Sequence, residues 1–253
     1  MSPIPRSHPR YHSLLVRAYL AEEMGRGIVA PEGLIAHGRG EAFDYLLGEE
    51  STPFALKAER AAAARLLLSE HPVLSVNGNV AALASREVAQ LAAALPGLRV
   101  EVNLFHRTPQ RAERIAEKLR RAGVIDVLGV HPTARLRGLP SDRGWVDENG
   151  ILAADTVLVP LEDGDRAQAL ARTGKFVITI DLNPLSRTTR AASLPIIDEL
   201  TRALPEIRRQ ALALRKRPGS WTQIVQGADP DALRGSAYEF IAERLGQMAR
   251  GTA

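Results

Sequence analysis

Residues 72–83 read PVLSVNGNVAAL: a short apolar run, an Asn-Gly-Asn turn and the start of an alanine-rich segment. Four further apolar runs follow, and helical patterns separate most of them. They are RVEVNLF, IDVLGV, TVLVPL and KFVITID, at residues 99–105, 125–130, 156–161 and 175–181. Short β-branched strands that alternate with helices favour a parallel sheet covered on both faces. The sequence therefore predicts an α/β fold whose sheet core spans residues 73–190.

Helical segments flank this core on both sides. Residues 1–72 carry helical patterns, and so do residues 191–253, where Pro195 and Pro205 are expected to break the first helical stretch. The 253 residues, 45% of them hydrophobic, suffice for one large domain. We predict a single α/β domain over residues 1–253, with helical additions at both ends.

Composition excludes several kinds of protein. The chain has no cysteine, so disulfides, thiolate metal sites and cysteine nucleophiles are excluded. No apolar run is long enough to span a bilayer, and the N-terminal residues include prolines and charges where a signal peptide needs an apolar stretch. We therefore expect a cytoplasmic protein with no membrane partner.

The chain is basic, with a formal net charge of +4 and a pI of about 9.7. A basic chain first suggests nucleic-acid binding. Here the cations are spread among acids, and only 4% of residues are aromatic and able to stack on bases. Arginines that bind small phosphates through bidentate contacts fit this pattern better, so we expect no nucleic-acid partner.

In open parallel sheets, ligands bind beyond the carboxyl ends of the strands. The first strand is followed by Asn77, Gly78 and Asn79. The glycine permits a tight turn into a helix, whose free N–H groups attract an anion. The alternative is an ordinary strand-to-helix turn without a ligand.

The second strand is followed by His106, Arg107 and, four residues later, Arg111. Doubly wound enzymes often hold a phosphate at this place. Two solvated arginines are the alternative, but the helix dipole opposes cations at a helix start. The pattern therefore favours a phosphate site.

The third informative strand end carries Glu162, Asp163 and Asp165, which crowd the start of a helix. Three carboxylates can hold Mg²⁺ directly or through water. Helix capping by Asp163 or Asp165 explains the same pattern without a metal. Both interpretations stay open at this point.

The run KFVITI is followed by DLNPLSRT, residues 181–188. A carboxylate, an amide, hydroxyls and a guanidinium converge there at the start of a helix, which suits ribose and polyphosphate recognition. The alternative is Asp/Asn turn chemistry followed by a serine cap.

The segment GLIAHGRGE, residues 33–41, contains three glycines within eight residues. It suggests a loop pressed close to another part of the molecule. His37 and Arg39 are candidates to face an anion from this loop. A tight connection between helices is the alternative.

Two nucleotide-binding fingerprints are missing. The sequence contains no GxxxxGK[ST] motif, and no GxGxxG follows the first strand. The second absence weakens the alternative of an NADP-dependent oxidoreductase, which Arg107 and Arg111 would otherwise support, because a 2′-phosphate often sits at that strand end.

Several long segments resemble the archaeal phosphopantothenate synthetases, also called 4-phosphopantoate–β-alanine ligases. The matching pieces are RSHPRYHSL, GLIAHGRGEAFDYLLGE, PVLSVNGNVAAL, EVNLFHRTPQR, VLVPLEDGDR and IDLNPLSRT, between residue 6 and about residue 190. The resemblance implies a Rossmann-like core, a homodimer and the use of ATP and Mg²⁺. The implied reaction joins 4-phosphopantoate to β-alanine in coenzyme A synthesis, and gives 4′-phosphopantothenate, AMP and pyrophosphate.

The resemblance also suggests roles for individual residues. The nucleotide would lie against Asp181, Leu182, Asn183, Arg187 and Thr188, with Arg17 and Arg39 at its phosphates. The phosphopantoate would lie near Asn77, Asn79, His106 and Arg107. The metal or the amine would meet Glu162, Asp163 and Asp165. Candidates for the chemical step are His37, Arg39 and Asp163, and whether the general base is a histidine or a carboxylate stays open.

Overall fold

The computed structural model of the chain describes residues 4–251. Six parallel strands form its central sheet, in the order β3-β2-β1-β6-β7-β8. The strands are β1 (Pro72–Val76), β2 (Arg99–Val102), β3 (Val127–Leu128), β6 (Thr156–Pro160), β7 (Phe176–Ile180) and β8 (Leu194–Ile196). The chain winds outward from β1 to β3 and then returns to begin β6 beside β1. The predicted α/β class, with a Rossmann-like parallel sheet, is confirmed.

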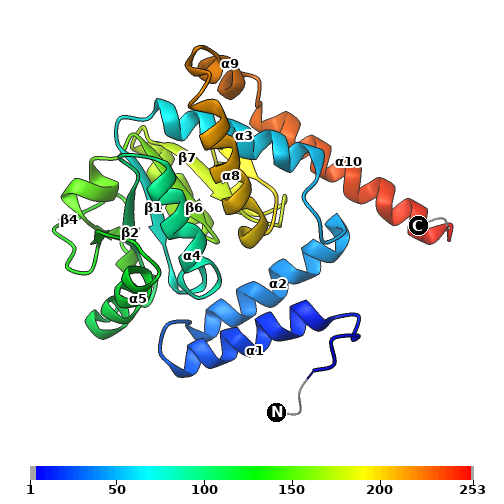
Figure 1. Cartoon of the computed structure of the whole chain (residues 1–253), viewed down its shortest axis with the longest axis horizontal. Coiled ribbons are helices and arrows are strands. Elements are labelled where there is room, and N and C mark those ends of the chain that lie inside the picture. Colours follow the sequence, from blue (N-terminus) through cyan, green and yellow to red (C-terminus); the bar gives the residue numbers. More distant parts are fainter. Residues whose placement is uncertain (1–3, 252–253) are drawn as a thin grey trace.

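Helices cover both faces of this sheet. Successive strand residues point to opposite faces, so Leu74 and Val76 pack among helices on one side, whereas Val73 and Val157 pack on the other. The first face is covered by α3 (Pro53–Leu68), α4 (Gly78–Ala94), α5 (Pro109–Arg121) and α8 (Leu200–Leu214). The second is covered by α6 (Gly164–Arg172) and residues 129–154. Figure 1 shows α4 and α8 lying across the sheet.

Residues 129–154, here called the crossover segment, connect β3 to β6 without an α-helix. The segment contains an antiparallel pair of short strands, β4 (Ala134–Arg135) and β5 (Trp145–Val146). A 3₁₀ turn, Asp142–Gly144, lies between these strands, and a π turn, Glu148–Leu152, follows them. The sequence of residues 131–150 predicts a polar connection, either an active-site flap or a surface loop.

The chain ends are helical. Helices α1 (Tyr11–Gly25) and α2 (Pro31–Leu47) form an N-terminal arm beside the body of the molecule (Figure 1). Helices α7 (Arg187–Ala191), α9 (Trp221–Gln226) and α10 (Pro230–Ala249) complete the fold. None of the helices in the described residues is both long enough and apolar enough to cross a membrane.

One expectation about the arm was wrong, because residues 33–41 lie inside α2 and do not form a loop. Pro31 occupies the first turn of α2, where its fixed φ suits a helix start, and Gly48 ends it with a left-handed φ of 90°. The glycines serve packing instead. A Cβ on Gly33 would clash with Asn79, and one on Gly40 would touch Leu182 at 3.7 Å.

Two features of the C-terminal segment also differ from expectation. Residues around Pro195 form strand β8, which pairs with β7 and extends the sheet beyond residue 190. Pro205 does not break α8 but lies exposed in its second turn. Since proline lacks an N–H group, only one helical hydrogen bond is lost there, on the solvent side.

Candidate active site at the carboxyl ends of the strands

The winding direction of the chain reverses between β1 and β6, and this switch point is where open α/β sheets bind ligands. Asn77 ties the two strand ends together. Its Nδ2 donates to Pro160 O at 3.2 Å and to Leu161 O at 2.9 Å, and its Oδ1 accepts from Val80 N. Leu161 has a φ of 51°, which is uncommon for a residue other than glycine. The Asn77 side chain is therefore fully used in shaping the crevice.

Two arginines occupy the neighbouring end of β2. Arg107 donates to Gly129 O and Val130 O, both at 2.6 Å, and its Nη1 is buried without a partner. Arg111 donates to Ile28 O twice and to His106 O once. Neither forms an ion pair with a carboxylate within residues 4–251. Burial lowers the pKa of both guanidinium groups, yet both remain charged.

The Arg111 charge lies beside a helix N-terminus. A Cβ on Gly78, the first residue of α4, would clash with Arg111 and with Ile28 O, so the Arg111 guanidinium packs directly on that helix start. Arg107 lies two residues before Pro109, at which α5 begins. Cations without an ion-pair partner among the described residues, one of them packed on a helix start, form a place that attracts an anion.

The N-terminal arm brings the predicted residues of α2 to the same edge. Asn79 donates from Nδ2 to Gly33 O at 2.8 Å, and Nε2 of His106 lies 3.5 Å from Glu32 Oε1. Arg39 is exposed, and its charge acts on the Asp181 carboxyl beyond β7. The arm therefore reaches from the end of β1 to the end of β7.

His37 and Arg17 lie on facing parts of the arm. Arg17 is paired with the buried carboxylate of Glu41, with Nη2 at 2.5 Å from Oε2. Burial lowers the pKa of His37, and the charge of Arg17 lowers it further, although Glu41 opposes them. His37 is therefore neutral near pH 7 and able to accept a proton.

The loop after β7 is organised by Asp181. Its carboxylate accepts from Asn183 N at 2.9 Å and from the Ser186 hydroxyl at 2.6 Å. Burial raises the pKa of Asp181, while these two donors act in the opposite direction. Thr188 donates from its hydroxyl to Glu162 O at 2.8 Å, which joins this loop to the end of β6. Leu182 is buried in a small apolar cluster with Leu47 of α2.

The end of β6 holds a buried ionic network. Glu162 is buried and pairs with two arginines, Arg166 of α6 and Arg143 of the crossover segment, the latter at 2.8 Å. Burial alone would raise the pKa of Glu162, but the two guanidinium groups outweigh it and the net shift is downward. Asp163 caps α6 by accepting from Arg166 N at 2.8 Å. Burial and the charge of Glu162 raise the pKa of Asp163.

This network does not fit the predicted magnesium site. Glu162 faces two arginines, Asp163 acts as the helix cap, and Asp165 pairs with Arg187 at 2.5 Å. The three carboxylates thus meet cations of the chain, which leaves no surplus negative charge for a dication. No group of three or more His, Asp or Glu side chains in the part of the chain that the structure describes is arranged to hold a metal ion.

Sequence patterns missed one prominent member of this edge, Arg143. It lies in the crossover segment and reaches the ends of both β2 and β6: its Nη1 donates to Asn103 O at 2.8 Å, and its Nη2 pairs with Glu162. No motif marks this arginine, because only the folding of the crossover segment brings residue 143 to residues 103 and 162. The predicted Arg39, Arg107 and Arg187 do share one edge of the sheet.

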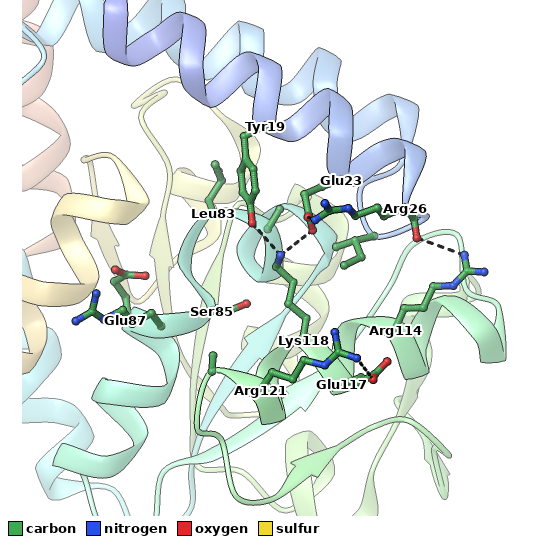
Figure 2. A pocket seen from close by; sticks show the side chains of 14 residues that line it. Tyr19, Glu23, Arg26, Leu83, Ser85, Glu87, Arg114, Glu117, Lys118 and Arg121 are labelled. Atoms are coloured by element: carbon green, nitrogen blue, oxygen red, sulfur yellow. Dashed lines mark hydrogen bonds and ion pairs between the residues drawn. The ribbon is translucent and has the colours of Figure 1, made fainter. Parts of the chain in front are cut away.

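A separate surface cleft of about 690 Å³ lies between α1, α4 and α5, and none of the predicted site residues lines it. Figure 2 shows Lys118 of α5 at its centre, bonded to Tyr19 OH and to Glu23 of α1, both at 2.8 Å. Arg114 donates nearby to Arg26 O. These polar contacts attach the arm to the body and leave the cations of the cleft largely occupied.

Comparison with known proteins extends over the whole chain. A family described as phosphopantothenate/pantothenate synthetase matches residues 54–244. A protein of Thermococcus onnurineus named 4-phosphopantoate–β-alanine ligase is 51% identical, with 99% of this chain and 97% of that protein aligned. Proteins of the same name from Thermococcus kodakarensis and Methanosarcina mazei are 57% and 51% identical, over 82% and 100% of this chain and 79% and 99% of their own lengths.

Proposed function

The chain belongs to the phosphopantothenate/pantothenate synthetase family, and from this premise we propose that it is the ATP-dependent ligase that joins 4-phosphopantoate to β-alanine. The products would be 4′-phosphopantothenate, AMP and pyrophosphate, in the synthesis of coenzyme A. The observation that carries this proposal is the pair Arg107 and Arg111 at the strand-end edge, which donate to backbone carbonyls and form no ion pair with a carboxylate among the described residues, with Arg111 packed on the start of α4.

We assign the phosphorylated acid to this end of the sheet. A phosphate there would meet the Arg107 guanidinium and the free N–H groups of α4, which start at Gly78. Asn79 and His106 border the same place. Asn77 has no free side-chain donor, so its contribution is to shape the crevice.

We assign ATP to the opposite half of the edge. The turn formed by Asp181, Leu182 and Asn183 and the start of α7 at Arg187 and Thr188 offer backbone N–H groups, hydroxyls and a guanidinium. Arg17 and Arg39 approach from the arm. Arg17 and Arg187 are each paired with a carboxylate, so nucleotide phosphates would compete with Glu41 and Asp165 for them.

The proposed chemistry has two steps. A carboxylate oxygen of phosphopantoate attacks the α-phosphorus of ATP, the bond to the bridging oxygen breaks, and pyrophosphate leaves. The amine of β-alanine then attacks the acyl carbon, the bond to the adenylate oxygen breaks, and AMP leaves. Holding the amine against the activated acyl group supplies effective concentration, and a closed cleft keeps water from the adenylate.

The amine must lose a proton during the second step. His37 is neutral because burial lowers its pKa, and Asp163 has a raised pKa, so both are suited to accept it. Comparing His37→Gln with Asp163→Asn decides between them: loss of the base slows amide formation while ATP binding persists. Mg²⁺ remains a prediction as the counter-ion of the ATP phosphates, and no carboxylate of this chain is assigned to it.

The predicted homodimer and cytoplasmic location are parts of the same proposal. On α10, the spacing of Tyr238, Ile241, Leu245 and Met248 in the sequence indicates one stripe, either intramolecular core or a dimer contact. Ile241 packs on a core cluster, whereas Tyr238, Leu245 and Met248 are exposed to between 39% and 56%. This exposed apolar row supports a contact between two copies. Light scattering on the purified protein measures the oligomeric state directly.

The decisive experiment is a turnover assay with ATP, 4-phosphopantoate and β-alanine that separates AMP from ADP. We expect AMP and pyrophosphate in equal amounts with the amide. ADP and inorganic phosphate together with the amide would show an acyl-phosphate route instead. Intact ATP binding without any turnover would reject the ligase assignment.

A further inference from the structure

The crossover segment is hydrogen-bonded to the loop after β2. Asn103, which follows β2 and is fully buried, donates from Nδ2 to Arg143 O at 3.1 Å and to Trp145 O at 2.9 Å. Arg107 N donates to Asp142 Oδ2 at 3.2 Å. The 3₁₀ turn Asp142–Gly144 is therefore fixed against the loop that carries the proposed phosphate site.

The same turn sends Arg143 to the other side of the switch point. Its side chain is only 8% exposed; Nη1 bonds to Asn103 O, and Nη2 lies 2.8 Å from Glu162 Oε1. In the sheet, β1 lies between β2 and β6. One guanidinium thus joins the loops after β2 and β6 across the end of β1, where the substrate crevice lies.

Arg143 and Arg166 both pair with Glu162, and Nε of Arg143 also lies 3.6 Å from Asp163 Oδ2. Arg166 is fully buried, so Glu162 keeps a cation when Arg143 is replaced. Burying a second guanidinium costs free energy, and burial lowers the pKa of Arg143 accordingly. Arg143 contributes the planar geometry of its guanidinium group, which binds a carbonyl and a carboxylate at the same time.

We propose that Arg143 is a positioning residue of the ligase reaction, which fixes the loop after β6, with Asp163, relative to the loop after β2, with Arg107. The inference rests on the proposed function. Arg143 acts through these loops and need not touch a substrate. It makes the crossover segment a wall of the crevice. Its side chain bonds to no residue of the nucleotide loop beyond β7, which meets the end of β6 through the Thr188–Glu162 O hydrogen bond.

The test replaces Arg143 by methionine and by lysine in the full-length protein. Arg143→Met keeps the apolar volume and loses the contacts to Asn103 O, Glu162 and Asp163, so kcat with all three substrates should fall about 100-fold, the loss typical of a small misplacement of reacting groups. ATP affinity, measured without the acid, should change less than about twofold. Arg143→Lys keeps the charge but not the planar guanidinium group, and its kcat should lie between those of Arg143→Met and the wild type.

Arg135→Met is the matched control, because Arg135 belongs to the same segment but bonds only within it, to Pro140 O at 2.8 Å and over the Trp145 ring. Its turnover should stay near that of the wild type. Circular dichroism melts should show all three variants folded. If Arg143→Met does not fold, Arg143→Lys serves as the test: its kcat should fall while its ATP affinity stays close to that of the wild type.

Three results would overturn the proposal: full turnover in Arg143→Met, equal losses in Arg143→Met and Arg135→Met, or a loss of ATP affinity that parallels the loss of kcat. Failure of the proposed function is distinguishable from these. It would appear as wild-type protein that forms no AMP, whatever the variants do.

Discussion

The two halves of the strand-end edge treat their arginines differently. At the ends of β1 and β2, Arg107 and Arg111 donate to backbone carbonyls and form no ion pair with a carboxylate among the described residues. At the ends of β6, β7 and β8, the arginines face carboxylates, as in Arg187–Asp165 and Arg202–Asp44. The first half is therefore ready to receive an anion, whereas an anion entering the second must displace a carboxylate or share a cation with it.

Arginine therefore has two different roles in this fold. A cation held by carbonyl oxygens is fixed in position but stays electrostatically available. A cation held by a carboxylate stabilises a loop, and its charge is largely used up. The contrast predicts that substitutions in the first half affect substrate capture most, and that those in the second act more weakly or through stability.

The largest effect is expected for Arg107→Met. It removes the guanidinium that we assign to the substrate phosphate, so kcat/KM for 4-phosphopantoate should fall about 100- to 1000-fold. ATP affinity should change little. Steady-state kinetics with phosphopantoate as the varied substrate measures the loss.

Arg120→Met is the control for this variant. Arg120 is exposed on the same α5 helix and pairs with Glu113 at 2.7 Å, away from the strand ends. A comparable loss in both variants would mean that general charge, and not the position of Arg107, attracts the substrate.

The second effect concerns the other half, where Arg187→Ala should weaken ATP binding about tenfold, the equivalent of one charge-assisted contact. Thermal stability should hardly change, because Arg187 and Asp165 are 64% and 68% exposed and exposed ion pairs contribute little. Calorimetric titration with ATP in the absence of the acid substrate gives the affinity. Unchanged affinity would show that the nucleotide lies elsewhere.

Much of the fold followed from sequence patterns, because strand runs and the polar residues after them are local features. The residues after β1, β2, β6 and β7 were all predicted, and all lie at one edge. Strand β8 was missed since it has only three residues and a central Pro195, which argues against a strand. Helix α2 was missed since Gly33, Gly38 and Gly40 weaken helix propensity, whereas close packing against Asn79 favours the small residue at 33.

The electrostatic difference between the halves was beyond sequence patterns. Arg107 and Arg187 each follow a strand. The neighbouring sequence does not indicate that the first bonds to carbonyls and the second to a carboxylate. The partners of Arg107 are Gly129 and Val130, more than twenty residues away along the chain. Arg143 was missed for the same reason. Pairing of charges is a property of the folded edge and not of any single motif.

The third effect is on stability and concerns Glu59, a fully buried residue of α3 near the end of β8. Burial, and then the neighbouring carboxylates of Asp198 and Glu206, raise its pKa from 4.5 to about 9. Burial and the two neighbouring carboxylates disfavour the charged form, so Glu59 is protonated near neutral pH. The unfolded chain releases that proton near pH 4.5, so the stabilising contribution is full below that pH and is lost as the pH rises through about 9.

Glu59→Gln keeps a donor toward Asp198 without a titrating proton. Its free energy of unfolding should exceed that of the wild type by roughly 1–3 kcal/mol at alkaline pH, with little difference in acid. Urea unfolding at several pH values measures this. Glu113→Gln, an exposed change on α5, should leave the pH dependence unaltered. A wild-type stability that does not decline toward pH 9 would contradict the assignment of the proton to Glu59.

The smallest effect is expected for Asp165→Asn, which tests the comparison most directly. The substitution would leave Arg187 without a carboxylate partner, as Arg107 is in the first half. Asp165→Asn removes the carboxylate that now pairs with Arg187 at 2.5 Å and leaves the guanidinium charge available. ATP should then bind about two- to fivefold more tightly, the equivalent of an exposed ion pair that no longer competes. The gain should shrink at high salt, since the competing attraction is screened by ions in the wild type as well. Titration of ATP into both proteins at low and high salt measures it. Weaker binding in Asp165→Asn would show that the carboxylate orients Arg187 for the nucleotide. The ion pairs in this half would then support nucleotide binding and not compete with it.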